Sequence, residues 1–435
     1  MEYSKDVGKG IRRKLSVKAD IQQIKKALVN TVFLLTLGIC ILLYCEWRGN
    51  FIDTYYVCKE YFLVLPVFSV VIFLLYYFQR KEPGKVEKPR KLYLDYARIT
   101  AAVCVILAHA CNMQRGEEAA VWRITLLTLC AGLGLVCNPL YVMISGSLLL
   151  SSEKKEPLWE FYYRRFIKVV IPLVVYYAIF LCVSGQMSFL PPENLGKGFL
   201  QILAGESDIV PHYWLIYTLI SLYIFAPFVG KIIKKFSDRQ LHICFWMILV
   251  MEQILTLLPL AGVEIGPVLE FIEWEGVFIL GYILTEKRNI VMEKAVLILG
   301  GISVIAISVI ILQDYSRIGY VCNAAPVMIL FAAAIMILLS KIKYVPNKYT
   351  GNAIKIMAKY SYAIILVHWY GLFVVTWGKL GLQPLRFGCI GGIILTVLVA
   401  TLVCLLMGFV GDNTVVFVIQ SIFEVPFKLI KRKKK

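Results

Sequence analysis

Long apolar runs recur along the whole chain, and each is close to the length that a helix needs to cross a membrane. Hydrophobic residues make up 59% of the 435 residues, more than the interior of a soluble domain takes up. A membrane-spanning helix needs about 20 apolar residues, whereas the strands of a membrane barrel alternate over shorter segments. The runs are long and do not alternate, so the sequence predicts an all-α, polytopic bundle of transmembrane helices.

About twelve spans of this length are predicted, two in the N-terminal part and ten in a core bundle. The fourth run is too long for one simple span and is predicted to be broken at Asn138-Pro139. It is therefore either one kinked helix or a short dipping segment followed by a helix. The predicted spans lie near 27–45, 61–78, 95–112, 121–150, 169–185, 213–230, 241–260, 269–284, 295–312, 321–340, 360–378 and 389–411.

Basic residues gather in alternate loops between these spans. The formal net charge is +18, and the charge asymmetry follows the rule that cytoplasmic loops are rich in Lys and Arg. We therefore expect a multi-pass protein of the plasma membrane with both termini in the cytoplasm. The C-terminal KRKKK is expected to contact anionic lipid headgroups, so membrane lipids are predicted partners and nucleic acid is not.

Three regions are predicted along the chain. Residues 1–91 hold a basic cytoplasmic segment, two spans and the charged linker at 79–91. Residues 92–411 hold the core membrane domain, and residues 412–435 form a basic cytoplasmic tail. The longest predicted external loop, 186–211, contains the apolar stretch GKGFLQILAG. This stretch either lies on the membrane surface or covers a cavity.

Arg98 and His109 lie within one apolar stretch, KLYLDYARITAAVCVILAHACNMQ. Ionisable residues are costly at that depth and indicate a functional site by default. Eleven residues of helix rotate by about 1100°, so both side chains share one face, about 16.5 Å apart along the axis. The alternatives are that Arg98 extends to the headgroups and that His109 makes a structural polar contact.

Six segments in order resemble the acyltransferase 3 family of membrane proteins. The first, KLYLDYARITAAVCVILAH, resembles the Arg-x10-His helix that opens the family's domain. The other five are NPLYVMISGSLLL, FYYRRFIKVVIP, HYWLIYTLISLYIFAPF, VFILGYIL and YSYAIILVHW. The resemblance covers roughly residues 92–411 and leaves the two N-terminal spans outside.

The resemblance implies an O-acyltransferase that moves an acyl group from cytosolic acyl-CoA to a hydroxyl of a cell-envelope or exported glycan. Acyl-CoA, most simply acetyl-CoA, is then the donor substrate, a glycan or lipid-linked glycan is the acceptor, and no cofactor is bound permanently. His109 is the predicted general base, because neutral histidine accepts protons near pH 7. Arg98 is predicted to pair with donor phosphate or to stabilise developing negative charge.

A second basic pair of the family, Arg-x-x-Arg, corresponds to Arg165 and Lys168. The lysine is a departure, since it lacks the planar fork that binds phosphate in a bidentate manner. Arg164 is expected to compensate, so all three residues are predicted to contact the donor together with Arg98. The alternative is an ordinary cluster of cytoplasmic positive charge.

Substrate contact is predicted for residues at the external ends of spans and on a late helix. Their side chains could equally serve as an interfacial aromatic belt, loop ends or packing groups. The twelve cysteines contain no CxxC pair, so no metal site is predicted. The predicted substrate-binding residues are His212, Trp214, Glu273, Glu275 and His368.

Two further functions stay open. The chain is alternatively a proton-coupled transporter or exporter of a glycan or metabolite, with His109 as proton relay, or a non-catalytic membrane sensor or anchor. Clear inverted repeats and a Walker loop are not found in the sequence, which weakens the transport interpretation. Ser145-Gly146-Ser147 lacks the pattern of a nucleophile elbow and favours close helix packing. The oligomeric state is not predicted.

Overall fold

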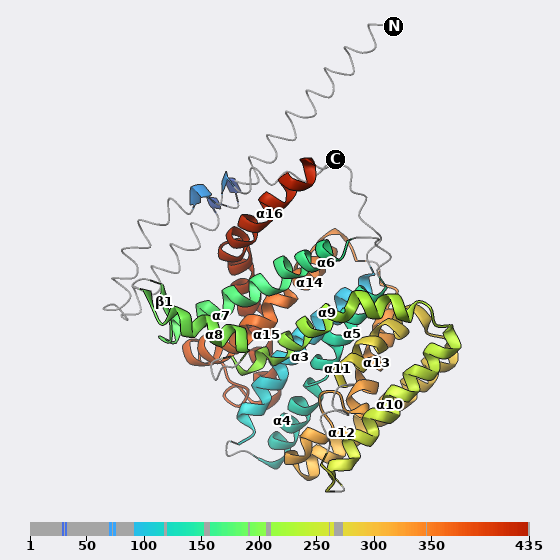
Figure 1. Ribbon diagram of the computed structural model, residues 1–435. Coiled ribbons are helices and arrows are strands. Elements are labelled where there is room, and N and C mark those ends of the chain that lie inside the picture. Colours follow the sequence, from blue (N-terminus) through green and yellow to red (C-terminus); the bar gives the residue numbers. More distant parts are fainter. Residues whose placement is uncertain are drawn as a thin grey trace. The chain divides into compact units, whose positions relative to one another are not determined.

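A computed structural model shows an all-α fold (Figure 1). The predicted spans near 27–45 and 61–78 lie almost wholly outside the residues that it describes. The chain divides into one compact unit of Arg90–Phe409 and a second unit of Met1–Pro89 with Val410–Lys435. The described residues are 28–29, 31–32, 69–71, 73–74, 91–116, 120–151, 157–189, 192–205, 210–260, 262–264, 273–344 and 346–433.

The unit Arg90–Phe409 contains all the candidate site residues. One short antiparallel pair of strands, β1 (Ser188–Phe189) and β2 (Pro192–Glu193), accompanies its helices. The helical elements are α3 (Leu92–Gln114), α4 (Val121–Gly134), α5 (Cys137–Leu150), α6 (Leu158–Arg165), η1 (Phe166–Val170), α7 (Ile171–Val183), α8 (Leu195–Ala204), η2 (Pro211–Tyr213), α9 (Trp214–Ile233), α10 (Asp238–Leu260), α11 (Glu273–Tyr282), η4 (Ile283–Lys287), α12 (Ile290–Gln313), η5 (Tyr315–Tyr320), α13 (Pro326–Ser340), α14 (Lys348–Trp369), η6 (Tyr370–Lys379) and α15 (Cys389–Asn413), and α16 (Val415–Lys433) belongs to the second unit.

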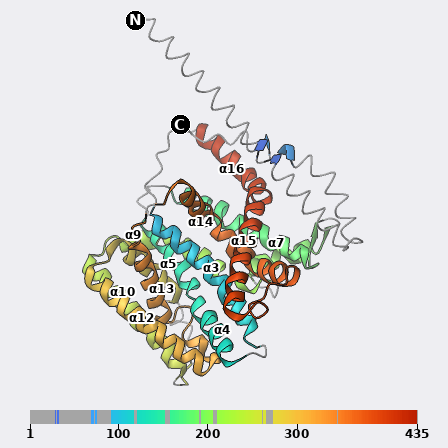
Figure 2. The ribbon, with the colours of Figure 1, turned by 180° about the vertical axis from the view of Figure 1, so that it is seen from behind.

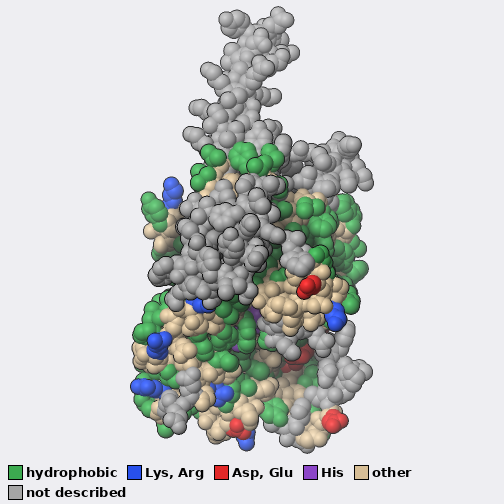
Figure 3. Space-filling view, turned by 90° about the vertical axis from the view of Figure 1, so that its left-hand side faces the viewer, with side chains coloured by type: hydrophobic (Ala, Val, Ile, Leu, Met, Phe, Trp, Pro, Cys, Tyr) green, Lys and Arg blue, Asp and Glu red, His purple; other side chains and the backbone are tan. Residues whose placement is uncertain are grey.

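Within the described residues, eight helical segments are long and apolar enough to cross a membrane. Hydrophobic side chains are spread over the described surface in Figure 3, with charged side chains few among them. The prediction of an all-α polytopic membrane bundle is confirmed, and the exact number of spans stays a prediction. The eight segments are Leu92–Gln114, Val121–Leu150, Leu158–Val183, Pro211–Ile233, Asp238–Leu258, Ile290–Gln313, Lys348–Lys379 and Cys389–Glu424.

The fourth predicted span is two helices, α4 and α5, that meet at a turn of Leu135 and Val136. Pro139 is the third residue of α5, where the backbone N–H of any residue lacks a partner within the helix. The proline is therefore tolerated there and does not cause the break. Both helices pack against α3.

At the centre of the unit, α5 and α11 lie against each other (Figure 1). Figure 2 shows α5 beside α3 from behind. A Cβ added at Gly146 would lie 1.8 Å from the carbonyl oxygen of Phe278, and one added at Gly281 would lie 2.0 Å from that of Met143. The two backbones therefore touch at both glycines. The predicted packing role of the Ser145-Gly146-Ser147 segment is confirmed.

Ion pairs tie the helices together at the end of the unit where α11 finishes and α12 begins. Lys287 pairs with Asp238 at 2.8 Å, and the carboxylate of Glu293 pairs with Arg288 at 3.1 Å and with Lys341 at 2.6 Å. The hydrogen bond to Asp238 raises the pKa of Lys287. These lysines and arginines belong to the basic clusters that predict the cytoplasmic side. Some of the residues that indicate the topology therefore also hold helices together.

The apolar stretch of the 186–211 loop forms α8. Gly198 and Ile202 face inward, and the hydroxyl of Tyr217 donates to the carbonyl of Ile202. Phe199 is exposed and Leu203 is 80% exposed on the opposite side. An outward apolar face of this kind favours a helix on the membrane surface over a cover for a cavity.

Candidate active site

Three of the chain's four histidines meet, although they come from three separate elements. His109 comes from α3, His212 from η2 and His368 from α14. The ring centroid of His368 lies 5.2 Å from that of His109 and 4.4 Å from that of His212. We call these three side chains the histidine cluster.

Backbone carbonyls of α14 hold two members of the cluster. Nδ1 of His368 donates to the carbonyl of Ile365 at 2.7 Å, and Nε2 of His212 donates to that of Leu366 at 3.4 Å. The hydroxyl of Tyr213 donates to the same Leu366 carbonyl at 2.9 Å. Since each neutral ring has one donor nitrogen, Nε2 of His368 and Nδ1 of His212 are left as acceptors, both buried and without a hydrogen-bond partner.

Trp369 closes the histidine cluster on one side. Its ring centroid lies 5.3 Å from that of His109, edge to face, and 5.8 Å from that of His212, stacked. An aromatic row continues from Trp369 through Phe373 to Trp377 along the π-helical η6. π-Helical turns are rare and occur frequently at functional sites. The sequence analysis missed Trp369, which directly follows His368 in the chain.

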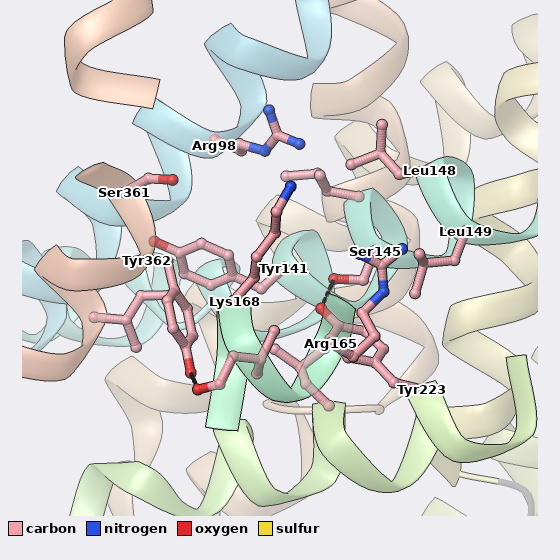
Figure 4. A pocket seen from close by; sticks show the side chains of 14 residues that line it. Arg98, Tyr141, Ser145, Leu148, Leu149, Arg165, Lys168, Tyr223, Ser361 and Tyr362 are labelled. Carbon is pink, nitrogen blue, oxygen red and sulfur yellow. Dashed lines mark hydrogen bonds between the residues drawn. The ribbon is translucent and has the colours of Figure 1, made fainter. Parts of the chain in front are cut away.

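A cavity of about 290 Å³ brings together three of the predicted donor-binding residues, Arg98, Arg165 and Lys168 (Figure 4). Arg98 comes from α3, Arg165 ends α6 and Lys168 lies in the π-helical η1. In Figure 4 the Lys168 side chain extends toward Arg98. The walls of this cationic cavity are Arg98, Tyr141, Ile144, Ser145, Leu148, Leu149, Arg165, Lys168, Val169, Leu219, Tyr223, Ser361, Tyr362 and Ile365.

Arg98 and Arg165 are held in place by neighbouring side chains. Nη1 of Arg98 pairs with Oδ1 of Asp95 at 3.0 Å, and the side chain of Asp95 is only 1% exposed. The guanidinium of Arg165 lies 4.9 Å from the ring centroid of Phe161, within the range of a cation–π contact. Arg98 is 29% exposed and lines the cavity.

Polar groups other than the cations also face the cationic cavity. The hydroxyls of Ser145 and Tyr223 lie 3.0 Å apart, and that of Tyr362 donates to the carbonyl of Val169 at 2.9 Å. The hydroxyl of Tyr141 is buried and has no hydrogen-bond partner. A buried polar group of this kind is costly unless a ligand or water satisfies it. Tyr141 is therefore a candidate ligand contact that the sequence analysis missed.

The cationic cavity and the histidine cluster are neighbours along two helices. Ile365 lines the cavity, and its carbonyl accepts the hydrogen bond from His368 one turn further along α14. On α3, the rise from Arg98 to His109 is about 16.5 Å. A ligand that is anchored on the cations and extends along α3 and α14 therefore reaches toward His109.

The remaining predicted residues lie elsewhere. Arg164 pairs with Glu160 at 3.4 Å and is not among the walls of the cationic cavity. The ring of Trp214 lies 5.5 Å from that of Trp274, and Glu275 is half-buried in the first turn of α11. Glu273 lines a second cavity, of about 380 Å³, between α10, α11 and the segment before α13.

Comparison with protein families gives one match. The family described as an acyltransferase domain matches residues 91–409. Comparison with curated proteins and with solved structures gives no match. Within the described residues, no three His, Cys, Asp or Glu side chains are arranged to hold a metal ion.

Proposed function

The chain belongs to the acyltransferase domain family, and from this premise we propose that it is an O-acyltransferase acting on glycans. It takes an acyl group, most simply acetyl, from cytosolic acyl-CoA. It transfers that group to a hydroxyl of a cell-envelope or exported glycan, free or linked to lipid. The chain is a multi-pass membrane protein, and we further propose that it lies in the plasma membrane.

One observation carries the proposal for the donor: Arg98, Arg165 and Lys168 line a single cavity. Coenzyme A carries a pyrophosphate and a ribose phosphate at one end and the reactive thioester at the other. Arginine forks bind phosphate in a bidentate manner, and lysine contributes a compact charge. In this proposal the phosphates bind to these cations. The unpartnered hydroxyl of Tyr141 forms a hydrogen bond with a polar group of the donor. Arg164, which pairs with Glu160, is left out of the donor site.

The histidine cluster supplies the chemistry in this proposal. His109 takes the proton of the acceptor hydroxyl as the oxygen attacks the thioester carbonyl. The tetrahedral intermediate then collapses, the carbon–sulfur bond breaks, and the thiolate leaves with the proton that His109 held. A positioned general base typically contributes about 10² to 10⁴ in rate. His212, His368 and Trp369 position the His109 ring through the contacts described above.

The spatial order of these groups supports a donor that comes from the cytoplasm. Arg98, Arg165 and Lys168 belong to the ends of helices that adjoin the predicted cytoplasmic loops. His109 lies further across the membrane on α3, about 16.5 Å from Arg98. The flexible pantetheine arm of the donor would bridge this distance, and the acceptor would approach from the outer half.

The test is release of coenzyme A by the purified protein in lipid nanodiscs. With acetyl-CoA and an envelope glycan fraction from a deletion strain, we expect free thiol to appear and mass spectrometry to find O-acetyl groups on the glycan. Transport of a glycan into sealed vesicles without thiol release would favour the transporter. Acetyl-CoA binding without turnover, with every glycan fraction supplied, would favour a sensor that has kept the fold.

A further inference from the structure

The second cavity, about 380 Å³ in volume, is acidic. It lies at the opposite end of α10 and α11 from the cytoplasmic ion pairs, in the proposed outer half of the bundle. Its volume falls in the range of roughly 300–1,000 Å³ that small-molecule sites occupy. The walls of this acidic cavity are Glu252, Leu255, Thr256, Glu273, Gly319, Tyr320, Cys322, Asn323, Ala324 and Ala325.

Glu252 is a buried polar residue of this cavity that needs a hydrogen-bond partner. The residue is only 3% exposed, and its Oε1 is buried without a hydrogen-bond partner. It lies within the apolar run of α10, where a carboxyl group is costly. A carboxyl group accepts hydrogen bonds and, when protonated, also donates one, so a ligand that satisfies this group presents hydroxyl, amino or amide groups.

The charge of the cavity excludes one class of ligand. Two of the ten wall residues, Glu252 and Glu273, are acidic, and none of the ten is Lys, Arg or His. In a partly buried site, like charges repel far more strongly than in water. A ligand with its own carboxylate or phosphate would therefore be disfavoured here, whereas hydroxyl and amino groups would be favoured.

The other walls suit a sugar ring. Tyr320 offers an aromatic face with a polar tip, and Asn323 adds a side-chain amide. The amide of Asn323 is fixed, because its Oδ1 accepts from Nδ2 of Asn138 at 3.0 Å. Fixed polar groups beside an aromatic ring are the usual means by which a site orients a hydroxyl-rich ligand.

Ring and amide contacts connect the acidic cavity to the proposed reaction site. Trp274 is next to Glu273, and its ring centroid lies 5.5 Å from that of Trp214. Trp214 comes two residues after His212 of the histidine cluster. Asn138 is the second residue of α5, whose later turns line the cationic cavity. A glycan held in the acidic cavity could therefore extend along these aromatic rings toward His109.

We propose that the acidic cavity is a binding subsite for one sugar unit of the acceptor, and that this sugar carries hydroxyl or amino groups and no anionic group. The inference rests on the proposed function, since it takes the ligand to be the acceptor glycan. It restricts that acceptor: polymers of uronic acids or phosphorylated sugars are excluded from the subsite. Glu252 and Glu273 set this selection, since they are the acidic residues among the walls.

The test compares three trisaccharides of matched size on the full-length protein in nanodiscs: maltotriose, the glucosamine trimer and trigalacturonic acid. Saturation-transfer NMR is suited to weak binding and needs no acyl-CoA. We expect maltotriose and the glucosamine trimer to bind, and trigalacturonic acid to bind at least tenfold more weakly. Binding of the acid as tight as that of maltotriose, or no binding by any of the three, would overturn the inference.

Matched variants test which residues disfavour the binding of trigalacturonic acid. Glu252→Gln removes the charge and keeps the size, so the discrimination against trigalacturonic acid should shrink severalfold, and Glu273→Gln should act in the same direction. Glu193→Gln, an exposed carboxylate on β2 outside the cavity, should leave it unchanged. Retained acetyl-CoA binding checks that each variant is folded. Equal discrimination in Glu252→Gln, Glu273→Gln and wild type would refute the assignment.

The two proposals fail separately in these experiments. Trisaccharide binding with the expected charge preference, in a protein that never releases coenzyme A, would refute the acyltransferase mechanism and leave the sugar subsite standing. Acetyl transfer to an acidic glycan, with equal binding of the neutral and the acidic trisaccharides, would refute the sugar subsite and leave the acyltransferase mechanism standing.

Discussion

His109 and His242 allow a matched comparison, because the first belongs to the histidine cluster and the second does not. His242 donates from Nε2 to the carbonyl of Lys287 at 2.6 Å, at the far end of α10. We expect His109→Gln to lower acetyl transfer by about 10² to 10⁴ with acetyl-CoA binding retained. His242→Gln, which can still donate to that carbonyl, should keep turnover near wild type. Near-full turnover in His109→Gln would remove the general base from the mechanism.

Arg98 is expected to act through its planar fork as well as its charge. Arg98→Lys keeps the charge and loses the second donor group, so the KM for acetyl-CoA should rise clearly. Arg164→Lys is the control, since Arg164 pairs with Glu160 outside the cationic cavity. Steady-state kinetics at varied acetyl-CoA would show the difference. Equal effects of the two substitutions would mean that the cavity does not bind the donor.

Lys168 stands where the family pattern has arginine, and its place in the cationic cavity gives this departure a consequence. Lys168→Arg should tighten donor binding, because it adds a fork opposite Arg98. Lys168→Glu should weaken it, and less so at high salt, since screening reduces charge repulsion. Calorimetric titration of coenzyme A at two ionic strengths measures both. Unchanged affinity in Lys168→Glu would limit this lysine to a topological role.

At the level of residues, the sequence analysis singled out ionisable groups such as Arg98 and His109, but it missed Glu252 and the uncharged Tyr141 and Trp369. Arg98 and His109 stand out because a charge is costly in an apolar run. The same rule applied to Glu252 would have found it within α10. Tyr141 and Trp369 carry no such signal, since aromatic residues are ordinary in membrane helices, and only the fold shows what they face.

At the level of elements, the contact between α5 and α11 makes a direct prediction. An alanine Cβ at Gly281 would lie 2.0 Å from the carbonyl oxygen of Met143, so Gly281→Ala should destabilise the fold by about 1–3 kcal/mol or more. Gly146→Ala should act in the same way. The control is Gly301→Ala on α12, where nothing lies within 4 Å. Thermal unfolding in detergent measures the difference, and equal midpoints for all three variants would contradict the backbone contact.

Most helices of the core were predictable, but their irregularities were not. The predicted spans near 95–112 and 295–312 fall within α3 and α12, because length and hydropathy determine both. The α4–α5 turn lies at Leu135 and Val136 instead of at Pro139, since a proline in the first turn of a helix breaks nothing. The π-helical η1 and η6 depend on packing and on backbone hydrogen bonding. The pattern of apolar residues in the sequence does not reveal either.

At the level of the whole molecule, the mechanism depends on sidedness. Charge asymmetry predicts that Lys348, at the start of α14, faces the cytoplasm and that Lys197, on α8, faces outward. A cysteine placed at 348 or 197 should therefore react with an impermeant maleimide from opposite faces of oriented, sealed vesicles. Peptide mass spectrometry separates each reporter from the native cysteines. Labelling of both from one face would overturn the predicted topology.

The same vesicles test donor sidedness. Impermeant acetyl-CoA should support transfer only when it is present on the face that labels at 348, because the cationic cavity adjoins that end of the helices. Detergent permeabilisation is the control, since it should restore activity in vesicles of the other orientation. Transfer driven by donor from the face that labels at 197 would contradict the assignment of the cationic cavity to the donor.

The backbone contact between α5 and α11 also limits how the molecule can move. α5 supplies Tyr141 and Ser145 to the cationic cavity, and α11 begins with Glu273 of the acidic cavity. Helices that touch at Gly146 and Gly281 cannot slide past each other without collision. Each helix of this pair therefore supplies wall residues to one of the two cavities, and we expect the pair to move as one body. A carrier, which exposes one central site to each side in turn, would therefore have to move at helices other than this pair.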